Sequence, residues 1–82
     1  LVLQFLEDKK GRVWVATFYG LKLYDPKVDT VKVIKFDTVE YVTLNRNFIV
    51  RVVESSDGTI WSATMGGLVK YNPETDIVKT YR

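Results

Sequence analysis

One stretch of sequence occurs twice in this chain, and this repeat restricts the possible folds more than any other feature. Residues 11–26 have the sequence GRVWVATFYGLKLYDP, and residues 58–73 have the sequence GTIWSATMGGLVKYNP. The two copies align without a gap at an offset of 47 residues, which is the separation of Trp14 and Trp61. Self-similarity at a period of 20–50 residues is typical of solenoids, propellers and arrays. The sequence therefore predicts two equivalent units.

The alignment extends beyond the repeated stretch and defines the organisation of the chain. We expect a first unit at residues 1–35, a connector at residues 36–47 and a second unit at residues 48–82. Each unit contains four short segments with the pattern of β-strands, and no segment shows the apolar spacing of a helix. The expected strands are residues 1–7, 12–17, 21–24 and 30–36 in the first unit, and residues 48–54, 59–64, 68–71 and 77–82 in the second.

The polarity of these strands changes from the first to the last. The first strand of each unit is apolar at nearly every position, which indicates cover on both faces. Trp14 and Trp61 occupy the second strand, and we expect both to be core residues. The fourth strand alternates valine with lysine, which is typical of an outer edge strand. This gradient predicts an all-β fold: two four-stranded antiparallel blades of a β-propeller.

The turns agree with this interpretation. Residues 8–11 and 55–58 have the composition of hairpin turns, in which Gly11 and Gly58 would supply a positive φ. The third strand of each unit ends at Asp25-Pro26 or Asn72-Pro73, which is the signature of a type I turn.

Composition excludes several functional classes. The chain of 82 residues has a net charge of +2 with lysines scattered among acids, so it lacks the basic stripe of a nucleic-acid surface. No apolar run approaches the roughly 18 residues of a membrane span, so we expect no direct membrane contact. The chain contains no cysteine and no histidine, which removes disulfides, thiolate metal sites and the commonest general base. We expect no catalytic residue, no metal and no cofactor.

The repeated unit resembles that of a known family, the two-component regulator propeller repeat. The residues that carry the resemblance in the first unit are Glu7-Asp8, Gly11, Trp14, Thr17, Gly20-Leu21, Tyr24 and Asp25-Pro26. In the second unit they are Glu54, Gly58, Trp61, Thr64, Gly67-Leu68, Tyr71 and Asn72-Pro73. The resemblance covers both units and most of the connector.

The resemblance implies a location and a role. Such repeats are similar to those that build the extracytoplasmic, periplasmic sensor of bacterial hybrid two-component systems, many of which respond to oligosaccharides. The resemblance therefore implies a piece of a ligand-sensing propeller. The alternative is a purely structural or protein-interaction segment with no small-molecule ligand. A third hypothesis, an enzyme similar to streptogramin-lyase-type propellers, is disfavoured because their chemistry needs a histidine, which this chain lacks.

The candidate ligand-binding residues lie in the connector and in one turn. Their side chains offer aromatic stacking and amide or guanidinium donors suited to sugars or carboxylates. These residues are Tyr19, Tyr41, Asn45, Arg46 and Asn47. The competing interpretation is that the asparagines bond the local backbone of a turn and that Tyr41 packs under the loop.

Two further candidates are polar residues at equivalent positions of the apolar first strands, Gln4 and Arg51. They either face a central channel and contact a ligand or make structural hydrogen bonds. Glu7 and Glu54 also form an equivalent pair, which we interpret as turn residues that accept backbone N–H bonds rather than as acid–base catalysts.

Two blades alone are too few for a closed propeller, since 4–8 blades are typical. They would leave the apolar face of a blade without a partner. We therefore expect the chain either to be a fragment of a longer propeller or to assemble with other copies into a ring with an even number of blades.

Overall fold

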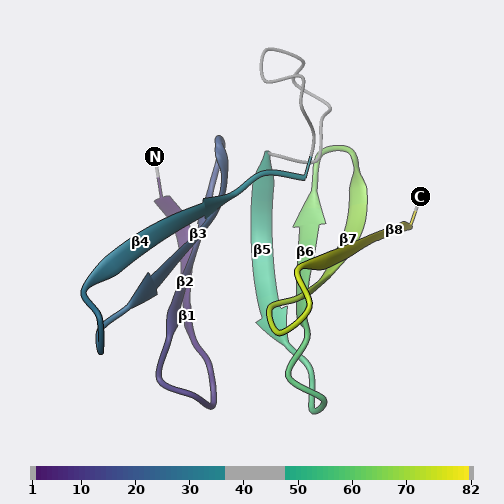
Figure 1. The fold of residues 1–82 in the computed structure, drawn as a ribbon. Coiled ribbons are helices and arrows are strands. Elements are labelled where there is room, and N and C mark those ends of the chain that lie inside the picture. The colour runs from purple at the N-terminus through teal and green to yellow at the C-terminus, as the bar shows by residue number, and fades with distance from the viewer. Residues whose placement is uncertain (1, 37–47, 82) are drawn as a thin grey trace.

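A computed structural model of the chain describes residues 2–36 and 48–81, and these form two four-stranded antiparallel sheets (Figure 1). The first sheet, blade 1, contains β1 (Val2–Glu7), β2 (Val13–Thr17), β3 (Gly20–Asp25) and β4 (Thr30–Ile34). The second sheet, blade 2, contains β5 (Ile49–Glu54), β6 (Ile60–Thr64), β7 (Gly67–Asn72) and β8 (Ile77–Tyr81). The predicted fold class is confirmed, and the strands agree with the expected ones to within two residues.

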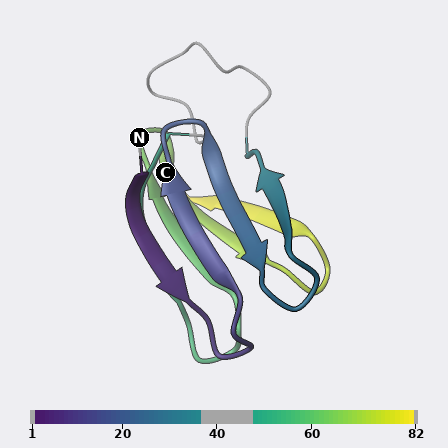
Figure 2. The same cartoon turned by 90° about the vertical axis from the view of Figure 1, so that its left-hand side faces the viewer.

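Each blade is a meander in which consecutive strands pair in the order of the sequence. The two sheets stack face to face, with the inner strands β1 and β5 in contact (Figures 1 and 2). Tight turns connect β1 to β2 and β5 to β6, and each contains a glycine in the left-handed region, Gly11 at φ 81° and Gly58 at φ 86°. The predicted positive φ of these glycines is therefore confirmed.

The core lies between the two blades. Blade 1 contributes Trp14, Ala16, Leu21 and Ile34, and blade 2 contributes Ile49, Val52, Ile60 and Tyr71. The rings of Trp14 and Tyr71 meet edge to face at a centroid distance of 5.9 Å, which is a favourable geometry for two aromatic rings. Burial of these side chains is the main force that holds the blades together.

Only one face of each blade is covered, which corrects the expectation that the inner strands are buried on both faces. Phe5 on β1 is 66% exposed and Val53 on β5 is 56% exposed. The physical reason is the stacking of only two sheets. Blade 1 packs through one face and blade 2 through the opposite face, so each has one side without cover among the described residues.

The same stacking corrects the expectation that both tryptophans are core residues. Trp14 is fully buried, whereas Trp61 is only partly buried and stacks on Tyr81 with ring centroids 5.6 Å apart. Both rings lie on the equivalent face of their blade. In blade 1 this face packs against blade 2, while in blade 2 it points away from blade 1.

Candidate functional site

The predicted candidate Tyr19 lies in the turn between β2 and β3, with a side chain that is 69% exposed. Its backbone N–H donates to Thr17 Oγ1 at 3.1 Å, which fixes the turn. The preceding residue, Phe18, stacks on Phe48 at a centroid distance of 4.1 Å. This contact places the Tyr19 turn beside the residue at which the connector joins blade 2. Tyr41, Asn45, Arg46 and Asn47 lie outside the described residues.

The two inner-strand candidates lie in different surroundings although their sequence positions are equivalent. Gln4 lies between the blades, where its Oε1 accepts a hydrogen bond from the backbone N–H of Val52 at 2.7 Å. Arg51 is exposed on the side of blade 2 that faces away from blade 1, opposite Ala63 in the β5–β6 register. Within residues 2–36 and 48–81, no hydrogen bond or ion pair joins Tyr19, Gln4 and Arg51. Their role in ligand binding stays a prediction.

Sequence reasoning did not anticipate a groove between the two blades, which we call the interblade groove. It has a volume of about 260 Å³ and lies where the β1–β2 turn approaches blade 2. Its lining residues are Lys9, Lys10, Arg12, Glu54, Ser56, Asp57, Gly58, Asn72 and Glu74. The lining thus combines cations from blade 1 with carboxylates from blade 2.

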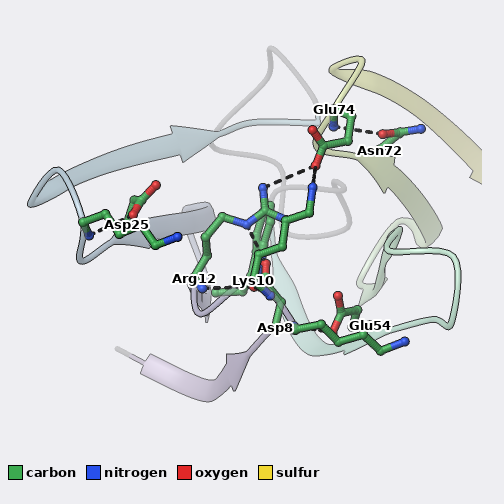
Figure 3. Close-up of polar contacts among 10 residues, drawn as sticks. Asp8, Lys10, Arg12, Asp25, Glu54, Asn72 and Glu74 are labelled. Carbon is green, nitrogen blue, oxygen red and sulfur yellow. Dashed lines mark hydrogen bonds and ion pairs between the residues drawn. The ribbon is translucent and has the colours of Figure 1, made fainter.

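Charged contacts cross this groove and link the blades (Figure 3). Lys10 Nζ lies 2.7 Å from Glu74 Oε1, and the Arg12 guanidinium lies 3.8 Å from the same oxygen. The hydrogen bond from Lys10 lowers the pKa of the Glu74 carboxyl from its usual value. Lys10 and Glu74 are both exposed, and pairs of this kind contribute little to stability. The pair of Lys10 and Glu74 therefore affects how the two blades are aligned more than it affects how strongly they bind each other.

Glu54 does not behave as a simple turn residue. Glu54 Oε1 accepts the backbone N–H of Lys9 at 3.0 Å, so it bonds the backbone of the other blade rather than its own turn. The Lys9 ammonium in turn donates to the carbonyl oxygen of Ser56 at 3.3 Å. The expected backbone N–H bond exists for Glu54, but it links the two blades.

Asp8 positions Arg12, which is one of the residues that line the groove. Its buried carboxylate accepts hydrogen bonds from Trp14 Nε1 and Arg12 Nε, each at 2.7 Å, and from the backbone N–H groups of Lys10 and Arg12. Burial by itself would raise the pKa of Asp8, but these donors favour the charged form and hold the pKa below its usual value. Asp8 therefore fixes the indole that forms the centre of the core and the guanidinium that faces Glu74.

Blade 2 builds the equivalent turn from different residues. Ser55 and Thr59 stand where blade 1 has Asp8 and Arg12, and Asp57 stands where blade 1 has Lys10. Asp57 Oδ1 accepts bonds from the Ser55 hydroxyl and from the Thr59 hydroxyl and N–H. The hydrogen bond from Ser55, followed by those from Thr59, lowers the pKa of Asp57 well below its usual value. The carboxylate that accepts the hydrogen bonds of the turn is thus two positions later in blade 2 than in blade 1. Because Asp57 stands where blade 1 has Lys10, the charge at that position of the turn is also reversed.

One sequence signal could have revealed the groove. At the 47-residue offset, Lys10 corresponds to Asp57 and Lys27 corresponds to Glu74, so two positions change sign between the units. Of these four residues, Lys10, Asp57 and Glu74 line the groove, whereas Lys27 lies in the β3–β4 turn of blade 1. Over residues 2–36 and 48–81, no group of three or more histidine, cysteine, aspartate or glutamate side chains is arranged to hold a metal ion. The groove offers paired charges for polar recognition.

Comparison with known proteins supports the family resemblance. Residues 1–19 match the family described as two component regulator propeller. The matched segment covers β1, the β1–β2 turn and β2, and it includes Asp8 and Trp14. The predicted identity of the repeat is confirmed for residues 1–19. A comparison with curated proteins gave no match. In the part of the chain that the structure describes, no helix is long and apolar enough to cross a membrane.

Proposed function

We propose that this chain is a segment of a ligand-sensing β-propeller in a two-component regulatory protein, and that its ligand is an oligosaccharide. The observation that carries the proposal is the match of residues 1–19 to the two component regulator propeller. The two antiparallel blades are the architecture that such repeats require. An extracytoplasmic location and a binding role rather than a catalytic one belong to the same proposal.

The Tyr19 turn supports the choice of ligand class. The tyrosine ring is exposed and held by a short turn, so it can stack on a sugar ring with little loss of conformational freedom. This turn lies beside Phe48, the residue that follows the connector, and four of the other predicted binding residues belong to the connector sequence: Tyr41, Asn45, Arg46 and Asn47. Tyr19 is thus the described residue best placed to contact a ligand at that end of the blades.

Isothermal titration with oligosaccharides from depolymerised polysaccharides tests this proposal. We expect one class of oligosaccharide to bind and Tyr19→Ala to weaken its binding at least tenfold, about 1.4 kcal/mol. Val28→Ala, which removes another exposed apolar side chain in the β3–β4 turn, serves as the control and should leave binding unchanged. Absence of binding across a broad panel, or equal effects of the two substitutions, would contradict the proposal.

A further inference from the structure

The two-blade stack ends in two apolar surfaces that no other residue in 2–36 or 48–81 covers. The strand registers place one set of side chains on the outer side of blade 1, which we call open face 1: Phe5, Val13, Val15, Tyr24 and Val31. They place a second set on the outer side of blade 2, which we call open face 2: Val53, Trp61, Ala63, Leu68 and Tyr81. Phe5 and Val31 are more than 60% exposed, and Leu68 is 41% exposed. Contiguous apolar surfaces of this kind mark interaction sites.

These two open faces are equivalent to the two halves of the interface that the chain already contains. At the 47-residue offset, open face 2 corresponds to the side of blade 1 that covers blade 2, with Trp61 in the place of Trp14. Open face 1 corresponds to the side of blade 2 that covers blade 1, with Tyr24 in the place of Tyr71. The edge-to-face pair of Trp14 and Tyr71 therefore has an unformed counterpart, one partner on each open face.

Charges at the borders of the open faces are complementary. The internal pair of Lys10 and Glu74 corresponds to Asp57 beside open face 2 and Lys27 beside open face 1. Both signs are reversed, so the attraction between the two positions is retained.

A second internal pair has a counterpart with unreversed signs. Lys32 Nζ lies 3.7 Å from Asp76 Oδ1, and the equivalent positions carry Lys79 and Asp29. Two independent positions are therefore complementary between the open faces. Such complementarity gives specificity and register to an association.

We propose that open face 2 of one copy binds open face 1 of a second copy, so that the chains associate head to tail. The contact repeats the geometry of the internal interface, with Trp61 against Tyr24 and Asp57 beside Lys27 of the second copy. Because it joins two different surfaces, it is heterologous and leads to closed rings if the rotation closes. Rings of two, three or four copies contain four, six or eight blades, within the usual size range of propellers.

Two substitutions make this contact weaker than the internal one. Lys22 stands on open face 1 where blade 2 has the buried Val69. Arg51 stands on open face 2 where blade 1 has Gln4, and an arginine cannot accept the N–H bond that Gln4 Oε1 receives. The association is therefore expected to depend on concentration, with separate chains at high dilution.

Light scattering behind a sizing column, over a series of concentrations, measures the association. We expect the mass to rise from that of one chain, 9.5 kDa, towards a closed multiple of it. Lys27→Glu places like charges at the contact and should raise the dissociation constant at least about tenfold. The opposite face is tested by transplanting the blade 1 turn into blade 2 with Ser55→Asp, Asp57→Lys and Thr59→Arg together. This triple substitution places at position 55 the acceptor that Asp8 provides in blade 1, so the turn keeps a hydrogen-bond acceptor.

Mixing the variants gives the decisive result. Each variant should associate poorly alone, because each opposes like charges across the contact. An equimolar mixture should associate at least as well as the unaltered chain, because the two variants can alternate with opposite charges at every contact. A chain that carries all four substitutions should behave in the same way. Circular dichroism of each variant serves as the check that it is folded.

Two outcomes would overturn the proposal. The first is a mass of one chain at every concentration, which would leave the open faces to blades of a different sequence. The second is association that survives in each variant alone or is not restored in the mixture, because the contact would then not place position 27 beside position 57. A symmetric dimer through one open face alone belongs to this second outcome.

Discussion

At the scale of single residues, Asp8 connects the polar groove to the apolar core. It holds the indole of Trp14 and the guanidinium of Arg12 with the same carboxylate, and both contacts are 2.7 Å long. A buried acceptor with this many donors is costly to disturb, because its removal leaves the donors unsatisfied. The position of one core side chain therefore depends on one buried charge.

Asp8→Asn should destabilise the chain by about 1.5–3 kcal/mol near neutral pH, because an amide cannot accept from all of the present donors. The lowered pKa of Asp8 also makes stability depend on pH. The contribution of the Asp8 carboxylate to the free energy of unfolding is fully present above the pKa of an unfolded aspartate, about 3.9, and is lost as the pH falls through the pKa of the folded state. Urea unfolding of the wild type should therefore show a midpoint that falls below about pH 4, and the variant should lose part of that dependence.

Asp25→Asn is the matched control for this substitution. Asp25 Oδ1 accepts the N–H of Lys27 at 3.0 Å, and the equivalent Asn72 makes the same bond to Glu74 at 2.9 Å. The amide therefore replaces the carboxylate in an arrangement that the chain already uses, and the change in stability should be small. A loss as large as that of Asp8→Asn would show that the Asp8 cluster is not the cause.

Ser62 is a second residue whose surroundings make a prediction. It is fully buried in the middle of β6, and its hydroxyl has no hydrogen-bond partner among the described residues. Blade 1 has Val15 at the equivalent position. Ser62→Ala should therefore raise the free energy of unfolding by about 1 kcal/mol, because it removes an unsatisfied buried polar group. Ser56→Ala, at an exposed turn, is the control, and a stabilising effect of equal size there would contradict the explanation.

At the scale of the elements, the strands could be predicted from the sequence, but the cover on their faces could not. Alternating patterns and turn residues determine where each strand begins and ends, and both are local properties of the chain. Cover is not local. Phe5 and Val52 are equivalent positions on β1 and β5, yet Phe5 is exposed and Val52 is fully buried. The difference arises from which side of each sheet has a neighbour.

The two tryptophans provide a test of this difference. Trp14→Ala should cost about 3–5 kcal/mol and abolish the β-sheet circular dichroism of so small a domain, because it empties the centre of the core. Trp61→Ala should retain the fold at micromolar concentration, since its ring is partly exposed. Equal losses in the two variants under dilute conditions would mean that the interface is wrongly placed.

At the scale of the whole molecule, only part of the candidate site could be predicted from the sequence. The turn that carries Tyr19 could be predicted because a turn between two strands is a local feature, and the structure places Tyr19 in that turn. The interblade groove was missed because its two walls are separated by more than 40 residues of sequence. Lys10 and Glu74 meet only when the two sheets are stacked. The sign reversal at the repeat offset was the one available signal.

The open faces lead to a last prediction at this scale, in which two copies of the chain are fused in tandem. The sequence of residues 36–47 would serve as the linker, which keeps the 47-residue period continuous and brings open face 2 of the first copy beside open face 1 of the second. The new internal interface should bury Trp61 of the first copy, raise the urea midpoint above that of the single chain and make it independent of concentration. The control fusion carries Lys27→Glu in its second copy, where the linked contact forms, and should gain less. If the fusion unfolds at the same urea midpoint as the dilute single chain, its four blades behave as two independent pairs. The contact between the open faces would then add no measurable stability, although its residues are equivalent to those of the internal interface.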